Sequence, residues 1–222
     1  MAQNTTSIIP LNVGVVLDLD NDHLDGNIGL SCINMSLSDF YATHGHYKTR
    51  LVLNIRDSKK DVVRAAAAGI QTRDFQLHTI GVRFGHLALD LIKNVEVQAI
   101  IGPTTSMQAN FVIDLGEKAQ VPITSFSASS PSLTSIRSPY FFRATQNDST
   151  QVNALTALVQ AFGWRAAVPI YIDNEYGEGI IPYLTDALQA VDARVPYQSV
   201  ISLSATDDQI VEELYKADDN AN

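Results

Sequence analysis

Short apolar runs alternate with amphipathic segments along the chain, and this alternation most constrains the fold. Runs suited to buried strands occur at 13–19, 50–55, 97–102, 121–126, 166–172 and 195–201. Segments with helical spacing of apolar residues lie near 33–41, 105–119, 149–162, 175–191 and 206–216. Strands that alternate with helices pair in parallel, and the helices then cover both faces of the sheet. The pattern therefore predicts an α/β fold with parallel sheets.

Length and charge limit the classes of function. The 222 residues are 45% hydrophobic and 18% charged, which suits one large globular domain or two smaller lobes. A net charge of −9 argues against nucleic acid and anionic membrane surfaces as partners, because both attract clustered Lys and Arg. Cys32 is the single cysteine, which excludes an internal disulfide and a metal site built on thiolates. We therefore expect no cofactor and no metal.

The sequence shows neither a membrane span nor a signal peptide. No apolar run approaches the roughly 18 residues that a transmembrane helix needs. The N-terminal stretch "MAQNTTSIIPLNVGVV" lacks a basic segment followed by an apolar one.

One segment interrupts the alternation. Residues 61–68 and 88–94 have helical patterns whose apolar positions share one face only when the 19 residues between them are removed. That intervening stretch, 69–87, holds three glycines and no helical period. We predict an insertion looped out of one helix, with an ordinary functional loop as the alternative.

An acidic cluster follows the first apolar run, in "VGVVLDLDNDHLDG" (13–26). Asp18 and Asp20 have the spacing of a haloacid-dehalogenase phosphatase, but Asp22 stands where Thr or Val is required, and no later magnesium motif is found. A calcium loop starting at Asp18 would need Gly and Glu where His23 and Gly29 stand. We interpret the cluster as solvated or helix-capping acids at the end of a strand.

Hydroxyl-rich turns follow two strands that we expect to be neighbours. "GPTTSMQ" places Thr104, Thr105 and Ser106 after one strand, and "SASSPSLTS" places Ser127 and Ser129 after the next. Ligands of open parallel sheets bind beyond the carboxyl ends of the strands, where helix N-termini offer N–H groups. The two turns would form a neutral, donor-rich floor for a carboxylate, or would only cap helices.

Two later junctions offer an acid and an aromatic ring. Asp148 opens a helix, where it could face a ligand ammonium or form a capping pattern with Gln151. Tyr176 precedes Gly177 at another helix start, where its ring could stack over a ligand or simply pack. Both positions lie at helix starts, so we expect them to line the same cleft as the two hydroxyl-rich turns, called the serine turns below.

Several long motifs resemble a known family. "NVGVVLDLD", "INMSLSDFY", "IGPTTSMQANF", "VPITSFSASSPSLTS", "YFFRATQNDSTQ", "AFGWRAAVPIYIDNEYGEGIIPYL" and "DDQIVEELYK" run in order through about 11–216, outside the insertion. They resemble the amino-terminal domain of plant glutamate receptor-like channels and, more broadly, the receptor family ligand-binding region. The resemblance implies a class I periplasmic-binding-protein-like fold, in which two Rossmann-like lobes with parallel sheets close on a ligand. It places lobe 1 at 1–145 and an incomplete lobe 2 at 146–222.

The same resemblance implies a set of site residues. In relatives that bind amino acids, the two turns hold the α-carboxylate and α-amino group, and an acid and a tyrosine of the second lobe complete the site. The matching positions here are Ser106, Ser127, Ser129, Asp148 and Tyr176, with the backbone of Ala128. The basic residue that metabotropic relatives use for an acidic ligand side chain has no counterpart in 25–32, so a neutral or small amino acid is expected.

The resemblance also implies a parent protein. We expect an oligomeric, tetrameric ligand-gated cation channel in the plasma membrane, with this domain on the extracellular side, binding an amino acid and performing no catalysis. The insertion and the short second lobe suggest a truncated or imperfectly spliced product. Asn4, Asn34 and Asn147 lie in N-x-(S/T) sequons, of which Asn4 and Asn147 are the glycosylation candidates. The alternatives are a free-standing soluble binding module, a non-functional fragment and a phosphatase.

Overall fold

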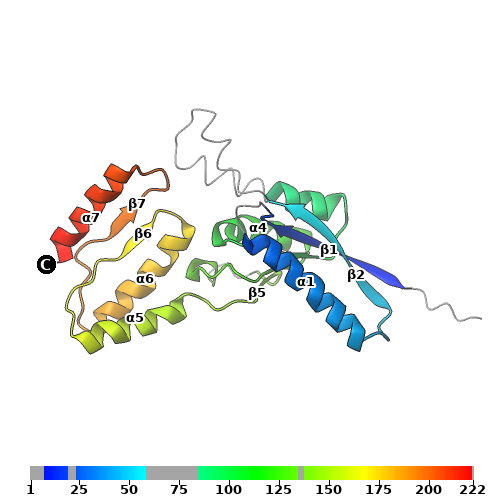
Figure 1. Ribbon diagram of the computed structural model, residues 1–222, viewed down its shortest axis with the longest axis horizontal. Coiled ribbons are helices and arrows are strands. Elements are labelled where there is room, and N and C mark those ends of the chain that lie inside the picture. Colours follow the sequence, from blue (N-terminus) through cyan, green and yellow to red (C-terminus); the bar gives the residue numbers. More distant parts are fainter. Residues whose placement is uncertain (1–7, 20–23, 59–84, 135–137, 222) are drawn as a thin grey trace, which may run out of the picture.

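The protein forms two α/β units that lie side by side (Figure 1). The computed structural model describes residues 8–19, 24–58, 85–134 and 138–221. We call residues 8–143 the N-terminal unit and residues 149–221 the C-terminal unit. The lobe boundary at 145/146 stays a prediction.

The N-terminal unit contains a five-stranded parallel sheet in the order β2-β1-β3-β4-β5. Its strands are β1 (Ile9–Leu17), β2 (Thr49–Asp57), β3 (Ala99–Ile101), β4 (Ile123–Ser125) and β5 (Phe141–Arg143). Its helices are α1 (Leu24–Thr43), a helical run at 85–93, α4 (Ser106–Ala119) and the short η1 (Pro131–Thr134). Four of the five strands were predicted, and β5 was not.

The C-terminal unit contains a two-stranded parallel sheet, β6 (Ile170–Ile172) and β7 (Ser199–Ile201). Three helices accompany it: α5 (Ser149–Phe162), α6 (Glu175–Gln189) and α7 (Asp207–Ala221). The predicted strands 166–172 and 195–201 are longer than the paired stretches, since Ala166 pairs with Arg194 only as an isolated bridge.

The core of the N-terminal unit follows from the apolar runs. Val15, Val16 and Leu17 are fully buried in β1, as expected for a central strand of a parallel sheet that is covered on both faces. Leu91 and Ile100 are buried in the same cluster as Val16. This rigid sheet fixes the ends of β3 and β4, from which the serine turns emerge.

Glycine allows one helix in each unit to start close to the preceding strand. A Cβ on Gly26, the third residue of α1, would lie 1.6 Å from the Asp18 carbonyl oxygen. A Cβ on Gly177, the third residue of α6, would lie 2.1 Å from the Ile172 carbonyl oxygen. Any side chain at either position would push the helix away, so these glycines set where α1 and α6 begin.

Three further sequence predictions can be compared with the described residues. The predicted insertion 69–87 extends too far at its end, because residues 85–87 are helical together with 88–93; the rest of it lies outside the described residues, as do Asn4, Asp20 and Asp22. Asp18 is only 4% exposed, so the prediction of a solvated acid is wrong there: the end of β1 lies under the start of α1. In the described ranges, no helix combines the length and apolar character needed to cross a membrane.

Candidate ligand-binding site

The two serine turns lie together, because β3 and β4 are adjacent parallel strands. The Ser130 N–H donates to Ser106 Oγ (3.0 Å), and Ser127 Oγ donates to the Thr104 carbonyl (2.7 Å). Ser106 is buried and Ser127 is exposed. Thr105 is the N-cap of α4 and accepts from the Gln108 N–H, so the capping alternative is correct for this hydroxyl.

The backbone of Ala128 is held inside its own turn. The Ala128 N–H donates to Ser125 Oγ (2.9 Å), and Ser125 Oγ donates to the Pro103 carbonyl (2.7 Å). Ala128 is completely buried. The Ala128 N–H therefore stabilises the turn, and a ligand that used it would have to displace the Ser125 hydroxyl.

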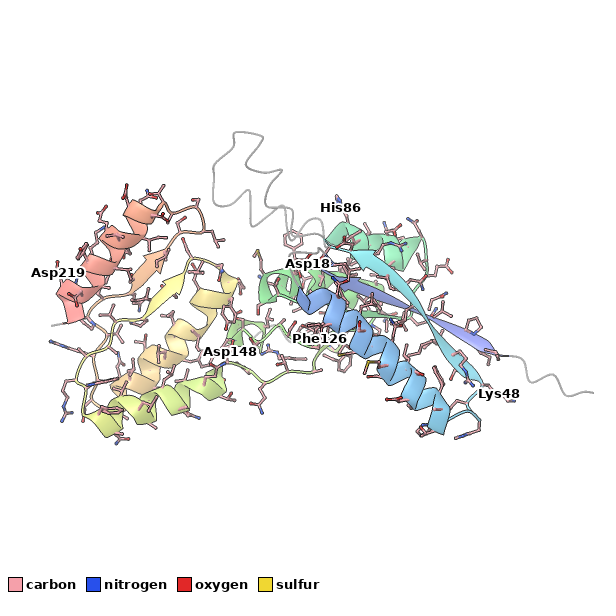
Figure 2. The ribbon with its side chains drawn as sticks, viewed as in Figure 1. Asp18, Lys48, His86, Phe126, Asp148 and Asp219 are labelled. Atoms are coloured by element: carbon pink, nitrogen blue, oxygen red, sulfur yellow. The ribbon has the colours of Figure 1, made fainter. Side chains whose placement is uncertain are left out.

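Asp148 lies at the start of α5, between the two sheets (Figure 2). Its side chain is nearly buried, and each carboxylate oxygen accepts a hydrogen bond: Ser129 Oγ donates to Oδ2 and Gln151 Nε2 donates to Oδ1, both at 2.7 Å. The Asp148 N–H also donates to the Ser129 carbonyl (3.0 Å). The side chain makes no capping bond to α5; Asn147 Oδ1 accepts from the Ser149 N–H instead. Asp148 thus faces the turn at 127–130, which contains Ser129 and is called the serine turn below.

Tyr176, in the first turn of α6, lies against the same carboxylate. Partial burial raises its phenol pKa, and the negative charge of Asp148 and a hydrogen bond to its carboxylate raise that pKa further. The side chain is still 56% exposed, which leaves ring area for a ligand to contact. Ser130 Oγ donates to the Glu175 carbonyl (3.2 Å), and this bond ties the start of α6 to the serine turn.

Arg143, the last residue of β5, contacts the turn that contains Ser129 and Ser130, and the sequence did not predict this contact. Its Nη1 donates to the Ser129 carbonyl (3.3 Å) and its Nη2 donates to the Ser130 carbonyl (3.1 Å). Burial lowers the pKa of the guanidinium, while the negative charge of Asp148 acts in the opposite direction. A basic residue that ends the run "YFFR", five positions before Asp148, was the available signal.

The structure brings Ser129, Asp148 and Tyr176 together, while Ser106 and Ser127 are bonded within the two turns. Ser127 and Ser129 come from one turn and Ser106 from the neighbouring turn, while Asp148 and Tyr176 come from two helix starts of the C-terminal unit. A carboxylate surrounded by hydroxyls can bind an ammonium group, and the hydroxyls can bind an anion. Within the described part of the chain, no group of three or more His, Cys, Asp or Glu side chains could hold a metal ion. Binding of any ligand by these residues stays a prediction.

Two of the cavities can be compared with this cluster as possible ligand sites. One of about 890 Å³ lies between α1 and the sheet, with Phe40, Tyr41 and Phe126 among its mainly apolar lining. None of its described lining residues is charged, so it does not suit a ligand with two charged groups. Another, of about 450 Å³, lies between Ser132 and α6 and borders the serine turn.

A family profile decides the relationship that the motifs suggested. The profile described as the receptor family ligand binding region matches residues 29–221. The chain belongs to this family. Its similar curated relatives include glutamate receptor 2.2 of Arabidopsis thaliana (53% identical over 206 residues) and glutamate receptor 2.4 of the same plant (54% over 214 residues). These alignments cover 93% and 96% of this chain but only 20% and 21% of the relatives, so the chain spans about a fifth of their length.

Solved structures give the same fold for this receptor ligand-binding region. The branched-chain amino acid transporter substrate-binding protein LivJ from Streptococcus pneumoniae, in complex with isoleucine, matches with a TM-score of 0.69 at 18% identity. An ABC transporter solute-binding protein from R. palustris, in complex with 4-hydroxybenzoate, matches with a TM-score of 0.69 at 20% identity. Each covers 94% of this chain, and this chain covers 54% and 52% of theirs. The class I periplasmic-binding-protein-like fold is therefore confirmed.

The same comparisons bear on whether the chain is an enzyme. Receptor ligand-binding regions and solute-binding proteins are not enzymes. This removes the support for a phosphatase centred on Asp18. Within the receptor family, the chain is similar to the ligand-binding region of plant glutamate receptors and corresponds to part of such a receptor.

Proposed function

We propose that this region binds an amino acid between its two units. The observation that carries the proposal is the nearly buried Asp148 carboxylate, which lies 2.7 Å from the hydroxyl of Ser129 and beside Tyr176. In the whole receptor, the region would regulate an oligomeric ligand-gated cation channel from the extracellular side of the plasma membrane.

Each part of an amino acid has a chemical counterpart in the cluster. The ligand ammonium would bind the Asp148 carboxylate, partly replacing the Ser129 hydroxyl that now donates to it. The ligand carboxylate would accept from the hydroxyls of Ser127 and Ser129. The half-exposed ring of Tyr176 would cover the ligand. The lack of a basic residue in 25–32 favours a neutral side chain.

Calorimetry with the standard amino acids tests the site. We expect saturable heat with a neutral amino acid and weaker binding in Asp148→Asn and Ser129→Ala. Loss of a polar partner should cost about 1–3 kcal/mol, or about 5- to 150-fold in Kd. Asp207→Asn, on exposed α7, is the matched control and should bind as the wild type does. Absence of heat with every amino acid would contradict the proposal, as would equal loss in the Asp207 variant.

The channel part of the proposal needs a separate test. Sequencing the full transcript should reveal membrane-spanning segments after the region homologous to this chain. A mature transcript that encodes only a binding module would favour the free-standing alternative.

A further inference from the structure

Arg143 connects the β5 strand with the serine turn. Its two terminal nitrogens reach two consecutive carbonyls, those of Ser129 and Ser130, at 3.3 and 3.1 Å. A guanidinium has a rigid planar fork of donors, so two such bonds fix both the position and the orientation of the peptide between the carbonyls.

The Ser129 carbonyl is held from a second side. It also accepts the backbone N–H of Asp148 (3.0 Å), and the hydroxyl of the same serine donates to the Asp148 carboxylate (2.7 Å). Residues from β5, the serine turn and the start of α5 thus form one connected group. A shift of the Ser129 carbonyl would move both the hydroxyl and the helix start that it holds.

Charge couples the same residues. Asp148 is only 7% exposed, and a nearly buried carboxylate needs hydrogen-bond donors or an opposite charge nearby to offset the loss of water contacts. The partly buried guanidinium of Arg143 supplies a positive charge that Asp148 in turn stabilises.

We propose that Arg143 is a positioning residue of the ligand site: it holds the Ser129 and Ser130 carbonyls so that the Ser129 hydroxyl and the Asp148 carboxylate are presented together. Arg143 does so from the N-terminal unit, without touching the ligand itself. The predicted effect of Arg143 on amino-acid affinity rests on the proposed function. Its predicted effect on the backbone of the serine turn does not.

The test compares Arg143→Met, Arg143→Lys and the control Arg165→Met, since Arg165 is an exposed arginine of the C-terminal unit. The probe is the standard amino acid that the wild-type chain binds most tightly. We expect a Kd about 10- to 100-fold weaker in the methionine variant, a smaller loss in the lysine variant and no change in the control. Added guanidinium ion should restore part of the affinity of the methionine variant, and sodium at equal ionic strength should not.

Amide hydrogen exchange supplies a readout that needs no ligand. The Asp148 N–H, bonded to the Ser129 carbonyl, should exchange faster in the methionine variant and at the wild-type rate in the control. Unchanged affinity and unchanged Asp148 exchange would overturn the proposal. If the wild type binds no amino acid, the proposed function fails, and the exchange of Asp148 still decides the role of Arg143. If the methionine variant does not fold, the lysine variant decides by the same two measurements, and wild-type values there would overturn the proposal.

Discussion

The two units use the same alternation of strand and helix but bury it to different degrees. In the N-terminal unit, five strands enclose a core in which Leu91, Ile100 and Ile123 are fully buried. In the C-terminal unit, two strands leave Ile170 and Ile172 of β6 50% and 48% exposed. Similar apolar runs therefore have different environments, because the number of neighbouring strands differs.

This difference indicates that the N-terminal unit contributes more to the free energy of unfolding than the C-terminal unit. Parallel strands are stable when both faces and both edges are covered, and a two-stranded parallel sheet has two open edges. The C-terminal core rests on a small cluster of Val159, Leu188 and Ala193. Trp164, the single tryptophan, stacks on Phe162 in this unit and gives a fluorescence signal that belongs to it alone.

The largest expected effect comes from removing one leucine from each core. Leu91→Ala should lower the free energy of unfolding towards the upper end of about 2–5 kcal/mol, and Leu188→Ala towards the lower end. Leu91 belongs to a cluster of eight buried residues, whereas only Val159 and Ala193 are buried together with Leu188, so the smaller cluster can relax more easily around a cavity. Urea unfolding followed by peptide-resolved hydrogen exchange and Trp164 fluorescence measures both. A larger loss in Leu188→Ala would contradict the comparison.

The two close-approach glycines test a feature that the units share. Gly26→Ala and Gly177→Ala should each cost about 1–3 kcal/mol or more, because the new Cβ overlaps a backbone carbonyl oxygen that cannot rotate away. Gly163→Ala is a contrast, since its Cβ would meet nothing within 4 Å and only its φ of 67° opposes the change. Thermal unfolding checks all three. Wild-type stability in either close-approach variant would show that the helix start can shift freely.

The exposed strand of the C-terminal unit should tolerate polar substitution. Ile170→Thr, at a half-exposed β6 position, should change the free energy of unfolding by no more than about 0.5 kcal/mol, since threonine keeps the β-branched shape. Light scattering should show less self-association, because an apolar edge position becomes polar. A loss comparable with that of Leu188→Ala would mean that β6 is buried in solution.

The smallest expected effect is on stability at acidic pH. Hydrogen bonds from Asn94 and Arg56 lower the pKa of Asp90 in the N-terminal unit, and a hydrogen bond from Tyr197 lowers the pKa of Glu213 in the C-terminal unit. A carboxyl whose pKa is lower in the folded chain stabilises the fold above its unfolded pKa and loses that contribution as the pH falls through its folded pKa. The loss should therefore begin below about pH 4.

Variants that remove the partners measure this contribution. Arg56→Gln and Tyr197→Phe should each flatten the acid limb of the stability curve slightly, with little change in its shape near neutral pH. Identical acid limbs in wild type and both variants would show that these surface pairs contribute nothing.

Proline explains why several strands are shorter than predicted. The apolar runs "VPITSF" and "AAVPIYI" suggest strands of six or seven residues, but pairing starts at Ile123 and Ile170, directly after Pro122 and Pro169. Proline has no N–H to donate to a ladder, so it stands at the first position or outside the paired stretch. The β5 strand escaped prediction because "YFFR" is short and is a strand only through its pairing with β4.

The order of strands and helices apart from β5 follows from the sequence by itself, because periodicity and turn chemistry are local properties. The same holds for the four junctions that carry hydroxyls, an acid and an aromatic ring. Tertiary structure alone decided which of these groups meet. Ser129 and Asp148 are 19 residues apart, and only the path of the chain from the serine turn through β5 brings their side chains to 2.7 Å. The same path turns Asp148 away from capping its helix and brings Arg143 to the Ser129 and Ser130 carbonyls, while the close approach of α1 to the end of β1 buries Asp18. Contacts between distant segments depend on how the sheets pack, and a local pattern does not encode that packing.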